Sequence, residues 1–163
     1  MTRRRIAYVD LAPGAGGSIV SLWLLVRGLD RERYEPLVVL QSGQPYRPRF
    51  EALGARVLMM AGCAGVNRPA ADSALTAEMR HSALAGWLRR GRRRAALLHA
   101  VGFLLKTLPA VRTVAGNLEV LLRAERPDLV HANDALSVAR PVILAARRAG
   151  IPAIAHVRAF APL

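Results

Sequence analysis

The 163-residue sequence contains a single cysteine, Cys63, and a single lysine, Lys106. One cysteine cannot form a disulfide within the chain, which excludes a disulfide-stabilised scaffold. Aromatic residues make up only 5% of the chain and no nucleic-acid-binding motif is present, so nucleic acid is not an expected partner. The four histidines are scattered without ligand spacing, and we therefore expect no metal site.

The sequence also lacks an apolar run long enough to cross a bilayer. Residues 95–105 form the longest later run, about 11 residues against the roughly 20 that a membrane-spanning helix needs. The basic start at 2–5 is followed by an apolar run that Asp10 soon interrupts, unlike a signal peptide. We therefore expect a cytoplasmic protein, with peripheral attachment to the inner face of the membrane as an open alternative.

Apolar residues are abundant, and the charge is strongly unbalanced. Hydrophobic residues make up 53% of the chain, which excludes a disordered protein and supports one globular domain over 1–163. The 24 basic and 11 acidic residues give a net charge of +13. This charge favours anionic or phosphate-bearing partners, but the near-exclusive use of arginine also suits a biased base composition. The net charge by itself therefore does not indicate a partner, whereas a local cluster of basic residues does.

Short apolar runs alternate with segments of helical periodicity. This pattern predicts a Rossmann-like α/β fold, a parallel sheet of about five or more strands flanked by helices. Residues 61–109 have no clear strand, which predicts a helical insertion between strands three and four. Pro141 predicts a kink in the last helix, or a helix that begins nearer the proline. The expected strands are 5–11, 37–40, 56–60, 128–131 and 153–157, and the expected helices are 18–29, 49–53, 111–126 and 136–149.

A glycine-rich loop follows the first expected strand. It contains Gly14, Gly16 and Gly17, and Ser18 is the expected N-cap of the next helix. Glycines let backbone N–H groups approach a phosphate or sugar closely, and the helix N-terminus favours an anion. A tight strand-to-helix turn also uses glycine. Three glycines exceed what one turn requires, so we favour ligand contact.

This region lacks residues that the common nucleotide-binding motifs require. A P-loop needs a lysine beside the glycines, and none lies near. A dinucleotide fingerprint needs a third glycine where Ile19 stands, and an acidic residue where the second strand ends in Gln41 and Ser42. A site for a phosphorylated dinucleotide that uses Arg47 or Arg49 remains an alternative.

Polar residues follow the fourth and fifth expected strands. His131, Asn133 and Asp134 end the fourth, and His156 and Arg158 end the fifth. The carboxyl ends of parallel strands share one edge, where ligands bind in open sheets, so we expect a cleft edge there. Asp134 also suits a helix N-cap. No nucleophile motif is present.

Several stretches together resemble a known family. Their order and spacing are similar to the amino-terminal, acceptor-side domain of GT-B glycosyltransferases, of the family 4-like kind. The likeness spans almost the whole chain except 61–109. It is carried by 5–9, the glycine-rich loop, 28–30, 34–40, 50–54, 126–133 and 150–158.

The resemblance implies sugar transfer from a nucleotide-sugar donor to an acceptor, lipid-linked or polysaccharide, with no metal and no cofactor beyond that co-substrate. Gly16 and Gly17 match the family's loop near the donor phosphates. His156 matches a position near the transferred sugar and is the catalytic candidate, although relatives often follow it with Asp, where this chain has Val157 and Arg158. The family binds the donor mainly on a second, carboxyl-terminal domain, which we expect to be absent here. The chain alone is then expected to be inactive.

An arginine block precedes the longest apolar run. It suits an anionic membrane surface, or else a solvated loop before a core helix. Two alternatives to the glycosyltransferase remain: a nucleotide-binding Rossmann-like domain of another enzyme class, and a basic peripheral-membrane or regulatory module. The membrane-facing candidates are Trp87, Arg89, Arg90, Arg92, Arg93 and Arg94.

Overall fold

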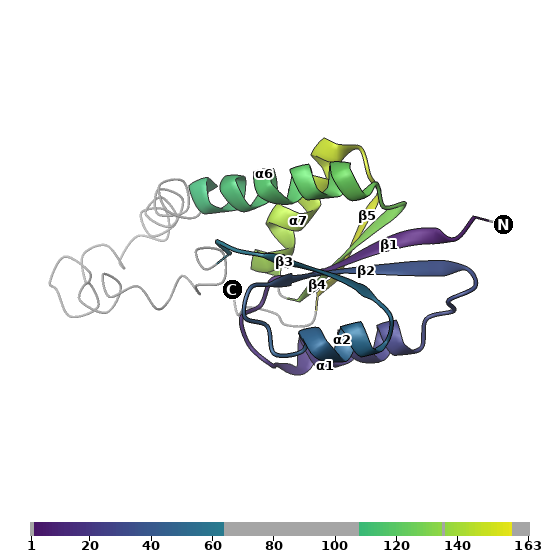
Figure 1. Cartoon of the computed structure of the whole chain (residues 1–163). Helices are drawn as coiled ribbons and strands as arrows, with labels where there is room; N and C mark the ends of the chain where they lie inside the picture. The colour runs from purple at the N-terminus through teal and green to yellow at the C-terminus, as the bar shows by residue number, and fades with distance from the viewer. Residues whose placement is uncertain (1, 64–107, 135, 158–163) are drawn as a thin grey trace, which may run out of the picture.

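The computed structural model describes residues 2–63, 108–134 and 136–157 (Figure 1). The predicted insertion at 61–109 lies almost entirely outside these ranges. The described elements follow one another as strands and helices of ordinary length. In chain order they are β1 (Arg4–Asp10), α1 (Gly17–Arg27), β2 (Tyr34–Gln41), α2 (Arg47–Ala52), β3 (Arg56–Met60), α6 (Leu108–Glu125), β4 (Leu129–Asp134), α7 (Leu136–Ala149) and β5 (Ala153–Val157).

The five strands form one parallel sheet in the order β3-β2-β1-β4-β5. The predicted Rossmann-like α/β fold is therefore confirmed. Chain order runs outward from β1 to β3 on one side and from β4 to β5 on the other. The chain thus changes direction between β1 and β4, and such a switch point opens a crevice at the carboxyl ends of the two strands.

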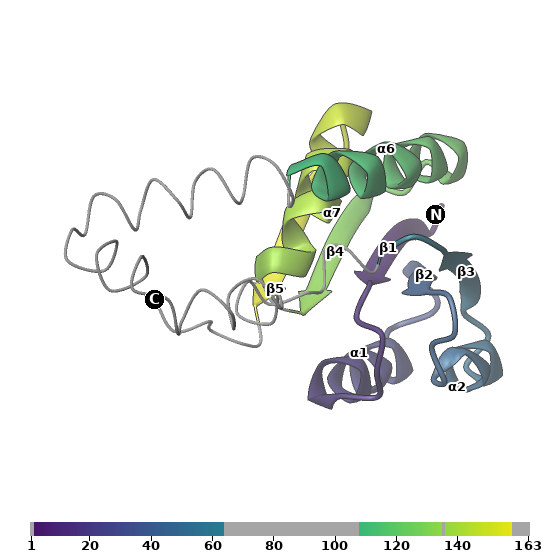
Figure 2. The same ribbon diagram turned by 90° about the vertical axis from the view of Figure 1, so that its left-hand side faces the viewer.

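Helices cover the two faces of the sheet separately, α1 and α2 on one and α6 and α7 on the other (Figure 2). Side chains alternate along β1 because successive residues point to opposite faces. Ala7 and Val9 pack in the cluster under α6 and α7, whereas Tyr8 packs with α1 and α2. This alternation places the residues at the end of β1 and β4 toward α1.

The start of α1 differs from the expected position. The helix begins at Gly17, with Gly16 as its N-cap, so the prediction of Ser18 as the cap is wrong. No side chain caps this end. Ser18 lies in the first turn, and its carbonyl oxygen accepts a hydrogen bond from β4. The first turn of α1 is thus tied to β4 by this hydrogen bond.

Pro141 does not delay the start of α7. The helix runs over Leu136–Ala149, the range that the sequence predicts, and Pro141 lies inside it. Of the two alternatives for the proline, the later helix start is therefore wrong. Val138 and Ala139, which precede the proline, are 5% and 1% exposed in the core. Their burial stabilises the first turn, because tertiary packing supplies most of a short helix's stability.

Ion pairs tie together the amino-terminal edge of the sheet. The Arg5 guanidinium donates to the Glu35 carboxylate at 3.0 Å and to the Glu125 carbonyl at 2.8 Å. The backbone N–H of Arg5 donates to the Asp128 carboxylate at 2.7 Å, and Arg56 pairs with Glu125 at 2.6 Å. These charged side chains thus link β1, β2, β3 and α6 at this edge of the sheet.

Candidate functional site at the switch point

Asp10 and Asn133 meet at the carboxyl ends of β1 and β4. Asp10 is fully buried and Asn133 is 1% exposed. The Asn133 amide nitrogen donates to an Asp10 carboxylate oxygen at 2.7 Å and to the Ser18 carbonyl at 3.1 Å. The other Asp10 oxygen accepts from the Ala12 N–H at 3.0 Å. This network joins two strands, the glycine-rich loop and the start of α1.

The glycine-rich loop follows β1 and is joined to this network through the Ala12 N–H, and its glycines are exposed. Gly14, Gly16 and Gly17 have no positive φ angle, and a Cβ added to any of them would meet nothing within 4 Å. Neither the turn geometry nor the packing therefore requires glycine at these positions. This observation favours ligand contact over the turn interpretation, because open space above a helix N-terminus is what an approaching ligand needs.

Sequence reasoning missed two residues of the site, Asp10 and Gln44. Gln44 lies in the loop after β2 and is 3% exposed. Its side-chain nitrogen donates to the carbonyls of Ala12 at 3.1 Å and Gly14 at 3.2 Å. The available signals were a carboxylate closing an apolar run and a Gly-Gln-Pro turn after a strand, but neither identifies its partner, which is distant in sequence.

An aromatic ladder extends the site toward the edge of the sheet. The rings of Tyr8 and His131 meet edge to face at 5.4 Å, and those of His131 and His156 at 5.8 Å. His131 is 5% exposed, whereas His156 lies on the exposed edge strand opposite Asn133. Burial raises the pKa of the Tyr8 hydroxyl, a shift that Arg31 partly opposes. The predicted pair of histidines is thus brought together.

The other predicted residues are placed less completely. The backbone of Asp134 ends β4 opposite Val157. Arg158, Trp87 and the arginine block at 89–94 lie outside the described residues. The cleft-edge role of Asp134 and Arg158 therefore remains a prediction.

The two arginines weighed for a phosphorylated dinucleotide have partners in and beside α2. Arg47 pairs with Glu51 at 2.7 Å. The Arg49 guanidinium lies 4.6 Å from the Tyr46 ring centroid, and it donates to the Tyr46 hydroxyl at 3.2 Å. Both would have to leave these contacts to bind a phosphate.

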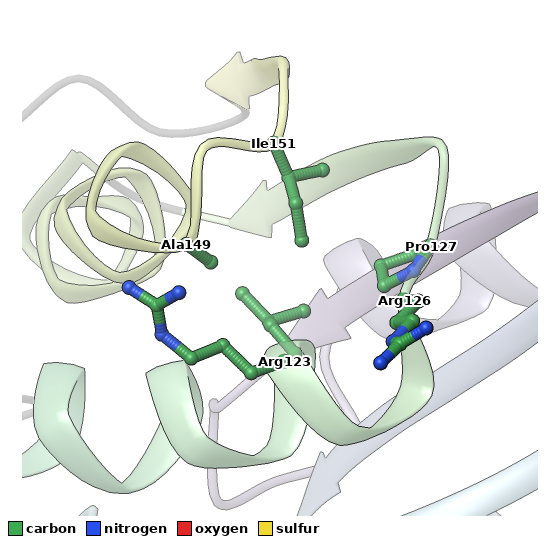
Figure 3. Close-up of a pocket in the computed structure, with 6 residues that line it drawn as sticks. Arg123, Arg126, Pro127, Ala149 and Ile151 are labelled. Carbon is green, nitrogen blue, oxygen red and sulfur yellow. The ribbon is translucent and has the colours of Figure 1, made fainter.

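A hollow of about 370 Å³ lies at the opposite edge of the sheet, where α6 and α7 end (Figure 3). Figure 3 shows Arg123 toward Ala149 and Arg126 beside Pro127, with Ile151 between them. Arginines stabilise the negative carboxyl ends of helices, and Arg123 also pairs with Glu119. The hollow thus has a structural explanation and is remote from the carboxyl edge.

Within the described ranges, no group of three or more His, Cys, Asp or Glu side chains is arranged to hold a metal ion. Among the helices of those same ranges, none is long and apolar enough to cross a bilayer.

No protein-family model matches the sequence, and no curated protein matches it. Solved structures do match. A protein assigned as a UDP-N-acetylglucosamine 2-epimerase from Listeria monocytogenes gives a TM-score of 0.53 at 12% identity, over 95% of this chain and 31% of that one. HepE from Anabaena, solved with UDP-glucose, gives 0.52 at 16% identity, over 94% and 29%. The glycosyltransferase of kitacinnamycin gives 0.50 at 18% identity, over 95% and 30%.

A different class of protein shares the fold as well. The C-terminal domain of a hydrogenase from Pyrococcus furiosus gives a TM-score of 0.52 at 12% identity, over 95% of this chain and 92% of that domain. Identities this low show the fold alone. The fold is thus a Rossmann-like α/β domain that sugar-nucleotide proteins and a hydrogenase domain both contain. The chain spans about 30% of the length of the sugar-nucleotide proteins that it matches.

Proposed function

We propose that this chain is the acceptor-side domain of a GT-B glycosyltransferase of the family 4-like kind. The observation that carries the proposal is the meeting of the glycine-rich loop with the polar end of β4 at the switch point, where Asn133 bonds to both Asp10 and Ser18. Ligands of open α/β sheets bind at this place. The sugar-nucleotide proteins with the same fold support the choice of ligand.

In the proposed reaction, Gly14, Gly16, Gly17 and Ser18 lie near the donor phosphates. Their backbone N–H groups stand at the positive end of α1, where an anion is stabilised. None of the three glycines has a Cβ that would keep the ligand at a distance, and the space above them is open. The donor is a nucleotide sugar that acts as co-substrate, and the proposed chemistry uses no metal.

His156 is the proposed catalytic residue. It is exposed on β5 and lies opposite Asn133, at the same edge as the loop. An imidazole can act as a general acid or base, which suits contact with the transferred sugar or the acceptor hydroxyl. The buried ring of His131 packs against it at 5.8 Å and orients it.

The proposed domain forms one wall of a cleft, and a second, donor-binding domain completes it, either on a longer polypeptide or on a separate chain. The test incubates the purified chain with labelled nucleotide sugars, alone and together with any Rossmann-like domain that continues its reading frame or is encoded in the neighbouring one. We expect transfer only in the combined reaction. Transfer by the chain alone would contradict the need for a second domain, and no transfer in either reaction would contradict the glycosyltransferase.

A matched pair of variants tests the role of His156 in the combined reaction. His156→Ala is expected to lower the transfer rate by about 10²-fold or more, as for loss of a group that acts in proton transfer. Thr113→Val changes an exposed residue of α6 on the other face and should leave the rate unchanged. Equal rates for His156→Ala and the wild type would remove His156 from the reaction.

A hydrogenase domain shares the fold, so this fold also occurs in another enzyme class, and a Rossmann-like nucleotide-binding domain of such a class is the second candidate. Calorimetric titration with NADPH and with NADH separates the two. The glycosyltransferase predicts binding of neither. Gln41 and Ser42 replace the acidic residue that the NADH ribose would contact, and Arg47 and Arg49, the candidates for the extra phosphate of NADPH, are engaged by Glu51 and Tyr46. Micromolar binding of either dinucleotide would support the second candidate.

For the arginine block we propose contact with an anionic membrane surface. Each arginine near such a surface contributes about 1 kcal/mol, so five could hold the domain there and bring it to a lipid-linked acceptor. Co-sedimentation with anionic and neutral vesicles tests this. Equal binding to both vesicle types would exclude electrostatic attachment, whereas binding that weakens with salt would support it.

A further inference from the structure

Gln44 is a buried polar side chain that touches the glycine-rich loop and nothing else that the proposed function uses. Its side-chain nitrogen has two hydrogens, and these go to the carbonyls of Ala12 and Gly14 at 3.1 and 3.2 Å. Its side-chain oxygen accepts from the Tyr46 N–H at 3.4 Å. All three polar contacts of the side chain therefore lie within the protein.

The backbone around Gln44 is held as firmly as its side chain. Gly43 has a φ of +85°, and the Gln44 N–H donates to the Gln41 carbonyl at 3.1 Å, which closes a turn after β2. The Gln44 carbonyl accepts from the Arg47 N–H at 3.3 Å, and Pro45 restricts the backbone of the residue before it. This turn directs the side chain across the sheet edge toward β1.

The two carbonyls that Gln44 binds belong to the loop proposed to face phosphate. Carbonyl oxygens repel an anion, whereas backbone N–H groups attract it. The Ala12 N–H donates to the Asp10 carboxylate at 3.0 Å, and the carbonyl of the same residue accepts from Gln44. Within the described ranges, the amide N–H groups at 14–18 donate no hydrogen bond to the protein, as is usual for the first turn of a helix.

We propose that Gln44 is the positioning residue that makes the glycine-rich loop a receptor for a phosphate group. By binding the carbonyls of Ala12 and Gly14, it turns them away from the ligand and leaves the loop's N–H groups to receive it. This inference rests on the proposed function, because it assumes that the loop meets the donor phosphates. Gln44 itself does not touch the ligand.

The experiment titrates the isotope-labelled full chain with inorganic pyrophosphate and follows the backbone amide signals of Gly14, Gly16 and Gly17. Gln44→Met keeps the length of the side chain but donates no hydrogen bond. Because a net hydrogen bond contributes roughly 1 kcal/mol, we expect about fivefold weaker binding or more, and a moved Gly14 signal before any ligand is added. Thr113→Val on α6 is the matched control and should bind like the wild type.

Gln44→Glu makes pyrophosphate binding depend on pH, which a purely structural role of Gln44 would not do. Near pH 7 its carboxylate would face two carbonyls and donate nothing, so pyrophosphate binding should be weaker than in Gln44→Met. Near pH 5 the desolvated carboxyl gains a proton and donates one bond, so binding should partly recover relative to the wild type at the same pH. Gln44→Met should show no such recovery.

The outcomes separate this inference from the function on which it rests. Wild-type affinity and an unmoved Gly14 signal in Gln44→Met would overturn the role of Gln44 while leaving the loop as a phosphate site. A wild-type chain whose loop amides do not respond to pyrophosphate would overturn the donor-phosphate role and this inference with it. Amide signals from β2 and β3 report whether each variant remains folded.

Discussion

Asn133 donates a buried hydrogen bond of 2.7 Å to Asp10, a residue 123 positions earlier in the sequence. The bond joins the carboxyl ends of β1 and β4 at the switch point of the sheet. It also aligns Ser18, whose carbonyl takes a second hydrogen of the same amide. The positions of the loop and of the first turn of α1 therefore depend on contacts between two halves of the chain that are distant in sequence.

Asn133→Asp would place a second carboxylate against Asp10 inside the protein. We expect the free energy of unfolding to fall by about 3 kcal/mol near pH 7, because a buried bond is lost and like charges meet. The close carboxylates raise the pKa of one group in the folded state above the ordinary value of about 3.9. The folded state then binds more protons than the unfolded state, so stability should rise as the pH is lowered toward 5.

Urea unfolding at pH 7 and pH 5 measures this change. Asn133→Ala is the control, since it removes the same bonds without adding a charge and should show no recovery beyond that of the wild type. If Asn133→Asp is equally unstable at both pH values, the contact with Asp10 is not the one described.

Gly17→Ala should separate folding from ligand binding. Gly17 begins α1, has no positive φ, and has room for a methyl group. Alanine at such a position is expected to raise the free energy of unfolding by roughly 0.5–1 kcal/mol. The methyl group would also occupy the space proposed for the donor, so transfer and pyrophosphate binding should weaken.

Gly150→Ala is the matched control for this prediction. Its φ of +73° is a conformation that costs an L-residue roughly 1–2 kcal/mol, so stability should fall while the loop still binds pyrophosphate. Chemical denaturation measures the first effect, and amide titration the second. Destabilisation by Gly17→Ala would show that the fold itself needs this glycine.

Arg126→Gly should stabilise the protein. Arg126 follows α6 with a φ of 48°, and its N–H bonds to the Leu122 carbonyl, a helix-ending geometry in which glycine is favoured. Relief of the left-handed strain is worth about 1 kcal/mol. Arg123→Gly, within the helix and paired with Glu119, should instead lower stability by about 1 kcal/mol. Midpoints of urea unfolding that move in the same direction for both variants would contradict this account.

Tyr8 should make the protein less stable at alkaline pH. Burial raises its pKa above the ordinary value of 10.0, so between that value and the folded pKa the unfolded chain loses the proton and the folded chain keeps it. The contribution is complete below about pH 10 and is lost as the pH rises, at up to about 1.4 kcal/mol per pH unit. Tyr8→Phe should show a shallower decline in unfolding free energy above pH 10, and an equal decline would contradict the burial of the hydroxyl.

The strands and helices could be predicted from the sequence because their signals are local. The runs that became β1 and β3, and the periodic spacing of Ile19, Leu22 and Val26 in α1, are visible without any tertiary contact. The boundaries could not be predicted as well. Local capping preference selects Ser18, but α1 begins at Gly17. Ser18 instead accepts a hydrogen bond from the distant Asn133 through its carbonyl, a contact that the local sequence does not show.

The candidate site was predictable only in part. Parallel strands bring their carboxyl ends to one edge, so the glycine-rich loop, His131, Asn133 and His156 were found from order alone. Gln44 was not, because its role depends on a turn that aims its side chain at a loop about thirty residues earlier. The cost of burying an amide is small only when every hydrogen finds an acceptor, and a sequence does not show where those acceptors will be.

The sequence by itself determined the class of fold and the positions where ligand chemistry concentrates, because apolar periodicity and strand-end polarity act within a few residues. The tertiary structure decided the strand order β3-β2-β1-β4-β5 and the switch point that it creates. It also left open space beside the glycines of the loop, where an added Cβ would meet no other atom within 4 Å. Both follow from contacts between segments far apart in the chain, and such contacts depend on which buried faces and polar groups can be satisfied together.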